Sequence, residues 1–291
     1  MKIAIKSFIQ FLLRGVFFFA PQKNMASNFY RIRLFALGQF QKMMMQRVRI
    51  QAHKGQILKF IAPNYLTDWR AQTFSTKEPE TLDWIDSMPE NCILWDVGAN
   101  IGIYSLYAAQ SKSAKVFAFD PSIFNLELLA RNIYLNKLQE KICIVPIALS
   151  DKTNFSAMHM TTTEMGGALS TFGESFGWDG EEINDNFTFS TIGITMDDAV
   201  SYLKIPAPDY IKIDVDGLEH LILLGGQKVL GQVNGVLIEV NDNFIEQAEG
   251  VTRALISSGL TLIDKKHSAY EFTSDLDLQS NSAFNQIWKR I

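Results

Sequence analysis

Short apolar runs alternate with helix-like stretches from about residue 90 onward, and this rhythm constrains the fold more than any other feature. The runs are Ile93–Val97, Val116–Phe119, Ile142–Ile147, Tyr210–Val215, Val236–Val240 and Leu260–Ile263. Helices are predicted between most of them, over 101–111, 122–137, 217–230 and 243–258. Apolar strands alternating with helices are typical of a parallel sheet covered on both faces. We therefore expect an α/β fold.

One stretch departs from this rhythm. Residues 152–190 are rich in Thr, Gly, Met and acidic residues and predict a long loop or a small hairpin. Loops of this length often close over substrates, but a surface insertion without function has the same composition, so both interpretations stay open.

The charge distribution separates the chain into two parts. Residues 1–67 contain 11 Lys or Arg and no acid, whereas the remaining 224 residues carry 16 basic and 31 acidic side chains. We expect a basic helical and hairpin extension over 1–67 and one α/β domain over 68–291. Such asymmetry favours a membrane or polyanion partner for the basic part.

Within this extension, residues 1–20 combine a basic stripe with an apolar surface. Lys2, Lys6, Gln10 and Arg14 are spaced four apart and form one polar stripe on a helix. This pattern suits a helix lying in the membrane interface, although burial in a dimer or against the body, or a signal anchor, stays open. A second helix is predicted over 29–46 and a hairpin over 48–61, with His53 as a residue of its turn rather than a ligand.

The two cysteines, Cys92 and Cys143, lie in or beside apolar runs. They are expected to be buried free thiols, which favours a reducing cytoplasm.

The first motif with chemical content follows the run Ile93–Val97. There the strand leads through a Gly-x-x-x-Gly turn, Gly98 to Gly102, into a helix. Glycine lets backbone approach a ligand, and the helix N-terminus attracts a negative group. A dinucleotide site would have Gly-x-Gly-x-x-Gly. The acid Asp96 suits a ligand with a cationic amine, such as S-adenosylmethionine.

The second motif ends the next strand. Asp120, followed by Pro121, lies 24 residues after Asp96, where an acid accepts hydrogen bonds from both ribose hydroxyls. Asn125 is close enough to touch the same ligand. Asn132 and Asn136 are expected to face solvent or to cap the helix.

The third motif is the strand and turn from Asp209 to His220. Lys212 is predicted to have a carboxylate partner, because it lies inside an apolar strand. Asp214 and Asp216 fall where open α/β sheets bind ligands, so a functional role is favoured for both. Glu219 is expected to be structural or to interact with a helix end, and His220 is undecided.

Together these residues resemble the FkbM family of S-adenosylmethionine-dependent methyltransferases, over about 70–270. The resemblance is carried by Asp96–Gly102, Ala148–Asp151, Thr195–Asp198, Ile211–Gly217 and the segment Lys77–Thr81. It implies a Rossmann-like class I methyltransferase with a seven-stranded, mostly parallel sheet. The basic residues 1–50 fall outside the resemblance, and the helical and hairpin extension is expected from the sequence pattern alone. Asp120 and Asp216 stand where glutamate is commoner in the family.

The resemblance also implies roles for particular residues. Asp96, Gly98, Asn100 and Gly102 would line the methionine end of the cofactor, which Glu78 would also reach. Asp120 and Pro121 would hold the ribose, Ala148 and Leu149 would flank the adenine with help from Asn125, and Asp214 would lie beside the transferable methyl. The implied reaction is O-methylation, often of a sugar or polyketide hydroxyl.

Several points stay open at this stage. The general base is expected among Asp214, Asp216, His220 and Glu239. Asp214, Glu239 and Asn241 are also candidate ligands for Mg²⁺. This interpretation is not favoured over one in which Glu239 and Asn241 cap the end of the strand and bind the substrate through hydrogen bonds. A glycan or lipid-linked saccharide at the cytoplasmic membrane face is the favoured acceptor. The alternatives are a soluble enzyme acting on a small natural product, and a non-catalytic module that binds nucleotide or nucleic acid. Nucleic acid is the disfavoured partner. Whether the chain forms a homo-oligomer stays open.

Overall fold

The computed structural model describes residues 28–267 and 282–291, and the chain divides into two compact units, 1–47 and 48–291. The predicted amphipathic helix over 1–20 lies outside the described residues. The second predicted helix is confirmed as α2 (Asn28–Met45). No helix in the described ranges is long and apolar enough to cross a membrane.

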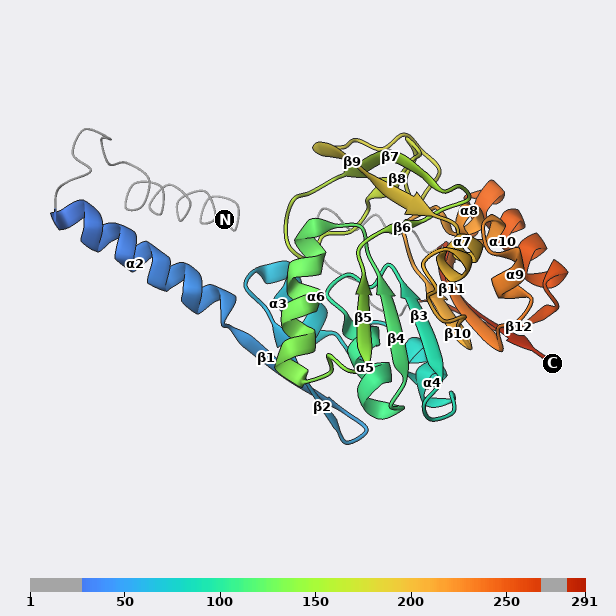
Figure 1. Cartoon of the computed structure of the whole chain (residues 1–291), viewed down its shortest axis with the longest axis horizontal. Helices are drawn as coiled ribbons and strands as arrows, with labels where there is room; N and C mark the ends of the chain where they lie inside the picture. Colours follow the sequence, from blue (N-terminus) through green and yellow to red (C-terminus); the bar gives the residue numbers. More distant parts are fainter. Residues whose placement is uncertain (1–27, 268–281) are drawn as a thin grey trace. The chain divides into compact units, whose positions relative to one another are not determined.

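The second unit is built on a seven-stranded sheet (Figure 1). In spatial order its strands are β12 (Leu260–His267), β13 (Ala283–Arg290), β11 (Gly235–Asn241), β10 (Tyr210–Ile213), β3 (Ile93–Val97), β4 (Lys115–Phe119) and β5 (Ile142–Val145). Every pair from β11 to β5 is parallel, and β13 is antiparallel to both its neighbours. The expected mostly parallel, seven-stranded sheet is confirmed. β13 is the strand that the apolar pattern did not predict.

Helices cover both faces, and side chains alternate between them along each strand. On β3, Trp95 and Val97 pack on one side with α7 to α10, while Leu94 packs on the other with α3 to α6. The helices are α3 (Tyr65–Gln72), α4 (Pro79–Asp86), α5 (Ile103–Ser111), α6 (Ile123–Asn136), α7 (Met196–Ser201), α8 (Glu219–Leu224), α9 (Gln227–Leu230) and α10 (Ile245–Ser257). The predicted helix over 217–230 is thus two short helices.

The predicted hairpin is present as β1 (Val48–His53) and β2 (Gln56–Ile61), and it packs within the second unit against α5 and α6. Asn132 holds it there: its side chain accepts from the Ile61 amide at 2.7 Å and donates to the Ile101 carbonyl at 2.9 Å. Asn136 bonds both backbone groups of Lys59. The expectation that Asn132 faces solvent or caps its helix is therefore wrong, because the hairpin covers that side of α6. Asn136 also donates to the Asn132 carbonyl in the last turn of its own helix at 2.8 Å, which agrees in part with the predicted capping.

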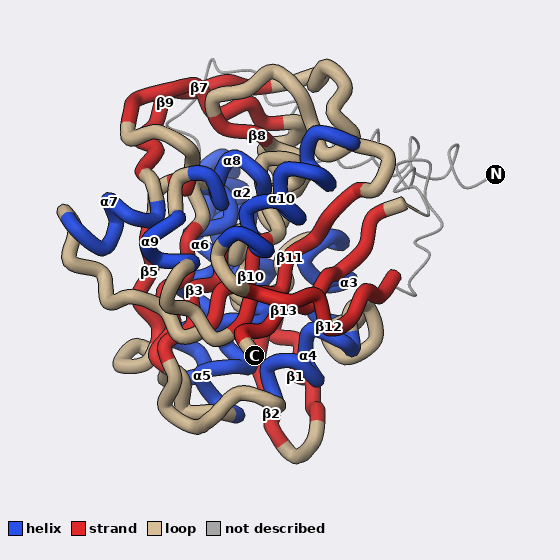
Figure 2. Tube along the Cα trace, turned by 90° about the vertical axis from the view of Figure 1, so that its right-hand side faces the viewer, coloured by secondary structure: helices blue, strands red, loops and turns tan. Residues whose placement is uncertain are grey.

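Residues 148–194 form a second sheet rather than a long loop. Its spatial order is β6 (Ala148–Leu149), β9 (Phe187–Ile194), β7 (Asn154–Met160) and β8 (Thr171–Phe172). β7 and β9 are antiparallel, so the hairpin alternative is correct for the ends of the 152–190 stretch. Figures 1 and 2 show this sheet beyond the end of the main sheet to which the parallel strands point.

Only one of the two cysteines is buried, as the sequence predicted for both. Cys92 is buried, whereas Cys143 is exposed. Cys143 lies on β5, the edge strand of the sheet, between residues that are more buried.

Candidate active site

Two cavities lie at the carboxyl ends of β3, β4 and β10, where the strand order reverses between β3 and β10. Ligands of open α/β sheets bind at such a point. The first cavity, about 620 Å³, is lined by Val97, Gly98, Asn100, Phe119, Asp120, Pro121, Ser122, Asn125, Ile147, Ala148, Leu149, Met158, Gly167, Ala168, Ser170, Phe172, Asp214, Val215, Asp216, Leu218 and Ile222. The second, about 460 Å³, is lined by Arg70, Thr73, Phe74, Lys77, Glu78, Gly98, Ala99, Asn100, Ile101, Ile103, Tyr104, Lys212 and Asp214. Gly98, Asn100 and Asp214 line both.

The two glycines that follow β3, Gly98 and Gly102, are required for different structural reasons. Gly98 has φ of 81°, and a Cβ there would lie 1.8 Å from the Asp214 carbonyl oxygen. A side chain at this position would therefore separate the ends of β3 and β10. Gly102 lines neither cavity; its φ is 87°, and a Cβ would lie 2.5 Å from Leu129 on α6. Gly102 thus permits helix packing beneath the site.

Asp120 faces the first cavity from the end of β4. Its two carboxylate oxygens accept from the backbone amides of Asn100 and Ser122, each at 2.8 Å. Burial raises the pKa of Asp120 to about 7, against these hydrogen bonds. Each oxygen keeps a further lone pair for a ligand hydroxyl. Pro121, Ala148 and Leu149 line the same cavity.

A loop over residues 165–169 closes this cavity from the side of the second sheet, and four of the side chains that line the two cavities tether it. Asn125 accepts from the Gly166 amide at 3.0 Å, and Asn100 donates to the Gly167 carbonyl at 2.8 Å. Arg70 Nε donates to the Gly166 carbonyl at 2.7 Å.

The fourth tether is Asp216, which accepts from the Leu169 amide at 2.6 Å. Asp216 has a left-handed backbone, with φ of 63°. Burial, and then the neighbouring Asp214 carboxylate, raise the pKa of Asp216 to about 6.

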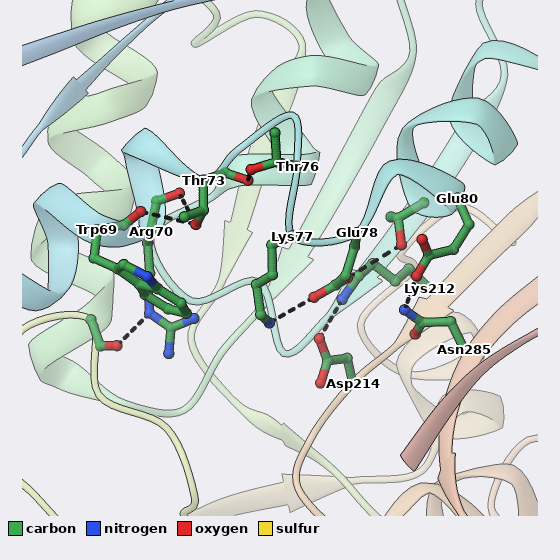
Figure 3. A network of polar contacts seen from close by, with 12 residues as sticks. Trp69, Arg70, Thr73, Thr76, Lys77, Glu78, Glu80, Lys212, Asp214 and Asn285 are labelled. Carbon is green, nitrogen blue, oxygen red and sulfur yellow. Dashed lines mark hydrogen bonds and ion pairs between the residues drawn. The ribbon is translucent and has the colours of Figure 1, made fainter. Parts of the chain in front are cut away.

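Beneath the second cavity lies a buried charge network (Figure 3). Lys212, only 2% exposed, donates to Asp214 Oδ2 at 2.9 Å and lies 5.0 Å from the centre of the Tyr104 ring. Lys77 pairs with Glu78 at 2.7 Å. Burial opposes the charge on Asp214, but the Lys212 ammonium outweighs it and holds the pKa of Asp214 below its ordinary value. The predicted carboxylate partner of Lys212 is confirmed.

The remaining predicted residues lie outside both cavities. Asp96 is buried and accepts from the Ser105 hydroxyl. Glu239, on β11, lines neither cavity; burial and then Asp214 raise its pKa well above the ordinary value. A general base has to lie within reach of the proton that it takes, and Glu239 is not at either cavity.

Glu219 and His220 start α8 and point in different directions. Glu219 accepts from the amides of Val215 and Gly217, each at 3.0 Å, and is structural as expected. His220 packs between Phe176 and Phe244, with ring centroids 6.5 and 5.7 Å away, and it lines neither cavity. The turn directs Glu219 inward, and this leaves His220 facing α10 rather than the site.

Asn241 is one of the oxygen ligands considered for Mg²⁺. Asn241 uses its side-chain oxygen to accept from the Asn243 amide at 3.0 Å. Among the residues described, no three His, Cys, Asp or Glu side chains are grouped as metal ligands.

The sequence pattern did not indicate Arg70, Tyr104 or Ser170 as site residues. No motif surrounds Arg70 or Ser170. The pattern of α5 indicates only that Tyr104 is one of its apolar residues. A pair of adjacent glycines, Gly166 and Gly167, was the one available signal that residues near 165 approach another backbone closely.

The sheet is open, and its strand order is that of a Rossmann-like methyltransferase fold. An acid at the end of the second parallel strand and polar cavities at the switch point agree with this fold. The profile of the methyltransferase FkbM domain matches residues 96–273. The chain belongs to the FkbM methyltransferase family and is an S-adenosylmethionine-dependent methyltransferase.

Individual relatives are distant. Hexuronic acid methyltransferase AglP of Haloferax volcanii is 24% identical over 187 residues, covering 64% of this chain and 72% of that protein. AMB antimetabolite synthetase AmbE of Pseudomonas aeruginosa is 24% identical over 228 residues, which are 68% of this chain but 10% of that protein. A solved precorrin-6y C5,15-methyltransferase from Geobacter metallireducens aligns with TM-score 0.41 and 12% identity, over 73% of this chain and 86% of that one.

Proposed function

We propose that this methyltransferase transfers the methyl group of S-adenosylmethionine to a hydroxyl group of a sugar. In this proposal the adenosine part of the cofactor occupies the first cavity and its amino-acid part enters the second. The proposal depends on Asp120, a buried acid at the end of the second parallel strand. It faces a cavity that shares Gly98, Asn100 and Asp214 with the second cavity.

The residues of the first cavity suit an adenosine group. Asp120 would accept from the ribose hydroxyls, and Ala148 and Leu149 offer an apolar surface for the base. Three buried polar atoms of this cavity, Asn100 Oδ1, Ser122 Oγ and Ser170 Oγ, find no partner among the described residues. Buried polar groups are normally hydrogen-bonded, so their vacant lone pairs and protons favour a polar ligand here.

The bound cofactor would supply a methyl group on a sulfonium, with a good leaving group. The chain then has to orient the acceptor and take its proton. Asp214 lines both cavities, and Lys212 keeps it ionised, so we assign it the proton of the acceptor hydroxyl. Asp216 is the second candidate base, because its pKa of about 6 is closer to neutral.

A sugar acceptor is supported by the similarity to a hexuronic acid methyltransferase. The basic residues of the segment 1–67 suit a negatively charged surface, and this supports a lipid-linked saccharide at the cytoplasmic membrane face as the acceptor. Sedimentation with anionic vesicles across a salt series tests this location, because electrostatic binding weakens as salt rises. Equal binding to neutral vesicles would contradict it.

The cofactor assignment is tested by calorimetric titration with S-adenosylhomocysteine. Asp120→Asn is expected to weaken binding at least about tenfold, since hydrogen bonds to charged groups contribute about 1.5–3 kcal/mol. Asp83→Asn changes an exposed carboxylate and is the matched control. Absence of binding to the unmodified enzyme would refute the assignment, and absence of methyl transfer to any hexose or hexuronate in a panel would refute the acceptor class.

A further inference from the structure

Arg70 stands apart from the other cations of the second cavity. It lies on α3 and is oriented by the hydrogen bond from its Nε to the Gly166 carbonyl, at 2.7 Å. Within the described part of the chain, neither of its terminal nitrogens donates to a protein acceptor. Arg70 lines the second cavity, and Figure 3 shows its guanidinium on the side of the network where Lys77 lies.

The other charges of this cavity are matched. Lys77 pairs with Glu78, and Lys212 pairs with Asp214, at 2.7 and 2.9 Å. Over the described ranges, no carboxylate lies within ion-pair distance of Arg70. Three cations and two carboxylates therefore line the cavity, and Arg70 is the cation without an ion-pair partner. The carboxylate whose charge acts most strongly on Arg70 is Asp216, which lines the first cavity and accepts from the Leu169 amide.

We propose that Arg70 binds a carboxylate group of a ligand in the second cavity. The planar guanidinium presents parallel N–H groups that match the two oxygens of a carboxylate. A single negative charge suits a single surplus positive charge, whereas a phosphate dianion would also meet the carboxylates of Glu78 and Asp214. The inference rests on the proposed function, which places the cofactor and the acceptor at these cavities.

Two ligands could supply this carboxylate: the amino-acid end of the cofactor, or an acidic sugar as acceptor. Binding experiments separate them without turnover. S-adenosylhomocysteine carries the amino-acid end, and 5′-methylthioadenosine lacks it. Glucuronate carries a carboxylate that glucose lacks. Each pair isolates the carboxylate-bearing group of one ligand.

The test compares the unmodified enzyme with Arg70→Gln and with Asn64→Asp. Asn64 is the matched control because it tethers the same loop, donating to the Met165 carbonyl at 2.9 Å, and aspartate keeps its capping of α3. If the carboxylate belongs to the cofactor, Arg70→Gln weakens binding of S-adenosylhomocysteine about 10- to 100-fold and leaves 5′-methylthioadenosine unchanged. If it belongs to the acceptor, both nucleosides bind as before. In that case, glucuronate binding to the S-adenosylhomocysteine complex, measured by NMR, is lost.

Equal weakening of both nucleosides by Arg70→Gln and Asn64→Asp would mean that Arg70 only holds the loop, and would overturn the proposal. So would unchanged affinity for all four probes. Failure of the unmodified enzyme to bind either nucleoside would instead refute the proposed function. Binding of 5′-methylthioadenosine to Arg70→Gln also shows that the variant is folded.

Discussion

Lys212 is the residue whose removal tests the reasoning about the charge network most directly. It is 2% exposed and has Asp214 as its hydrogen-bonded partner, while the Asp96 carboxyl also interacts with its charge. Lys212→Met keeps an unbranched side chain as long as the four-carbon part of lysine, with sulfur in place of Cδ, and removes the ammonium group. The change leaves the Asp214 carboxylate near Glu78 without its closest cation.

The expected loss of unfolding free energy is about 3–5 kcal/mol, the usual effect of breaking a buried ion pair from one side. For a unit of this size this corresponds to a fall in melting temperature of about 6–20 °C. Lys152→Met is the matched control, because Lys152 is 71% exposed and pairs with Asp151 at the surface. That variant should lose less than about 1 kcal/mol.

The effect should depend on pH with a definite sign. In the unmodified enzyme the folded pKa of Asp214 is lowered, so its contribution to stability is present at neutral pH and is lost as the pH falls through that pKa. Without Lys212, burial raises the folded pKa of Asp214 above the unfolded value. The folded variant then takes up a proton at mildly acidic pH, and the stability difference between the two proteins shrinks.

Urea denaturation at pH 8 and pH 5 measures both quantities. A second variant, Asp214→Asn with Lys212→Met, should recover part of the loss, because no unpaired charge remains. The reasoning fails if Lys212→Met is no more destabilising than Lys152→Met. It also fails if the difference from the unmodified enzyme is larger at pH 5 than at pH 8.

Three further predictions concern the same site. Gly98→Ala should destabilise by about 2–5 kcal/mol, from left-handed strain and contact with the Asp214 carbonyl, as measured by urea denaturation; a change below 1 kcal/mol would contradict it. Asn132→Ala should lose about 2–4 kcal/mol, since two buried backbone groups lose their partner, and hydrogen exchange should speed up in the β1–β2 hairpin; protection equal to that of the unmodified enzyme would exclude this role. Asp216→Asn should stabilise the fold by roughly 2 kcal/mol at pH 8 and little at pH 4. The reason is that the pKa of Asp216 is raised in the folded state, so the ionised carboxylate is unfavourable as the pH rises through about 6. Thermal melts at pH 8 and pH 4 measure the difference, and an equal shift in melting temperature at the two pH values would contradict it.

The sequence predicted the parts of the fold that depend on local pattern. Six strands were expected from their apolar runs, and all six are present. β13 was missed because polar residues interrupt its pattern. Asn285 is buried and donates to Glu80, and Gln286 accepts from the Trp288 indole, so partners distant in sequence or on the same strand satisfy them. The partner of Asn285 is 205 residues away and is not visible in a local window.

The residues of the site that the sequence predicted are likewise those that depend on local pattern. The sequence placed Asp120, Asn125 and Asp214 at the cavities because each lies at or just after a strand end, and strand ends share one edge of a parallel sheet. Arg70 could not be found, since its orientation depends on a carbonyl 96 residues away. His220 was kept as a candidate base because the sequence does not say which way α8 turns.

The position of β13 has a consequence for how the chain assembles. β13 follows β12 in sequence but lies between β11 and β12, so it is an interior strand of the sheet. During synthesis from the N-terminus, β12 has no strand to pair with until β13 has emerged, and the edge of β11 stays open for the same period. Nascent chains halted before residue 283 would therefore expose two unpaired edges, which makes this interval the one in which a chaperone would be needed most.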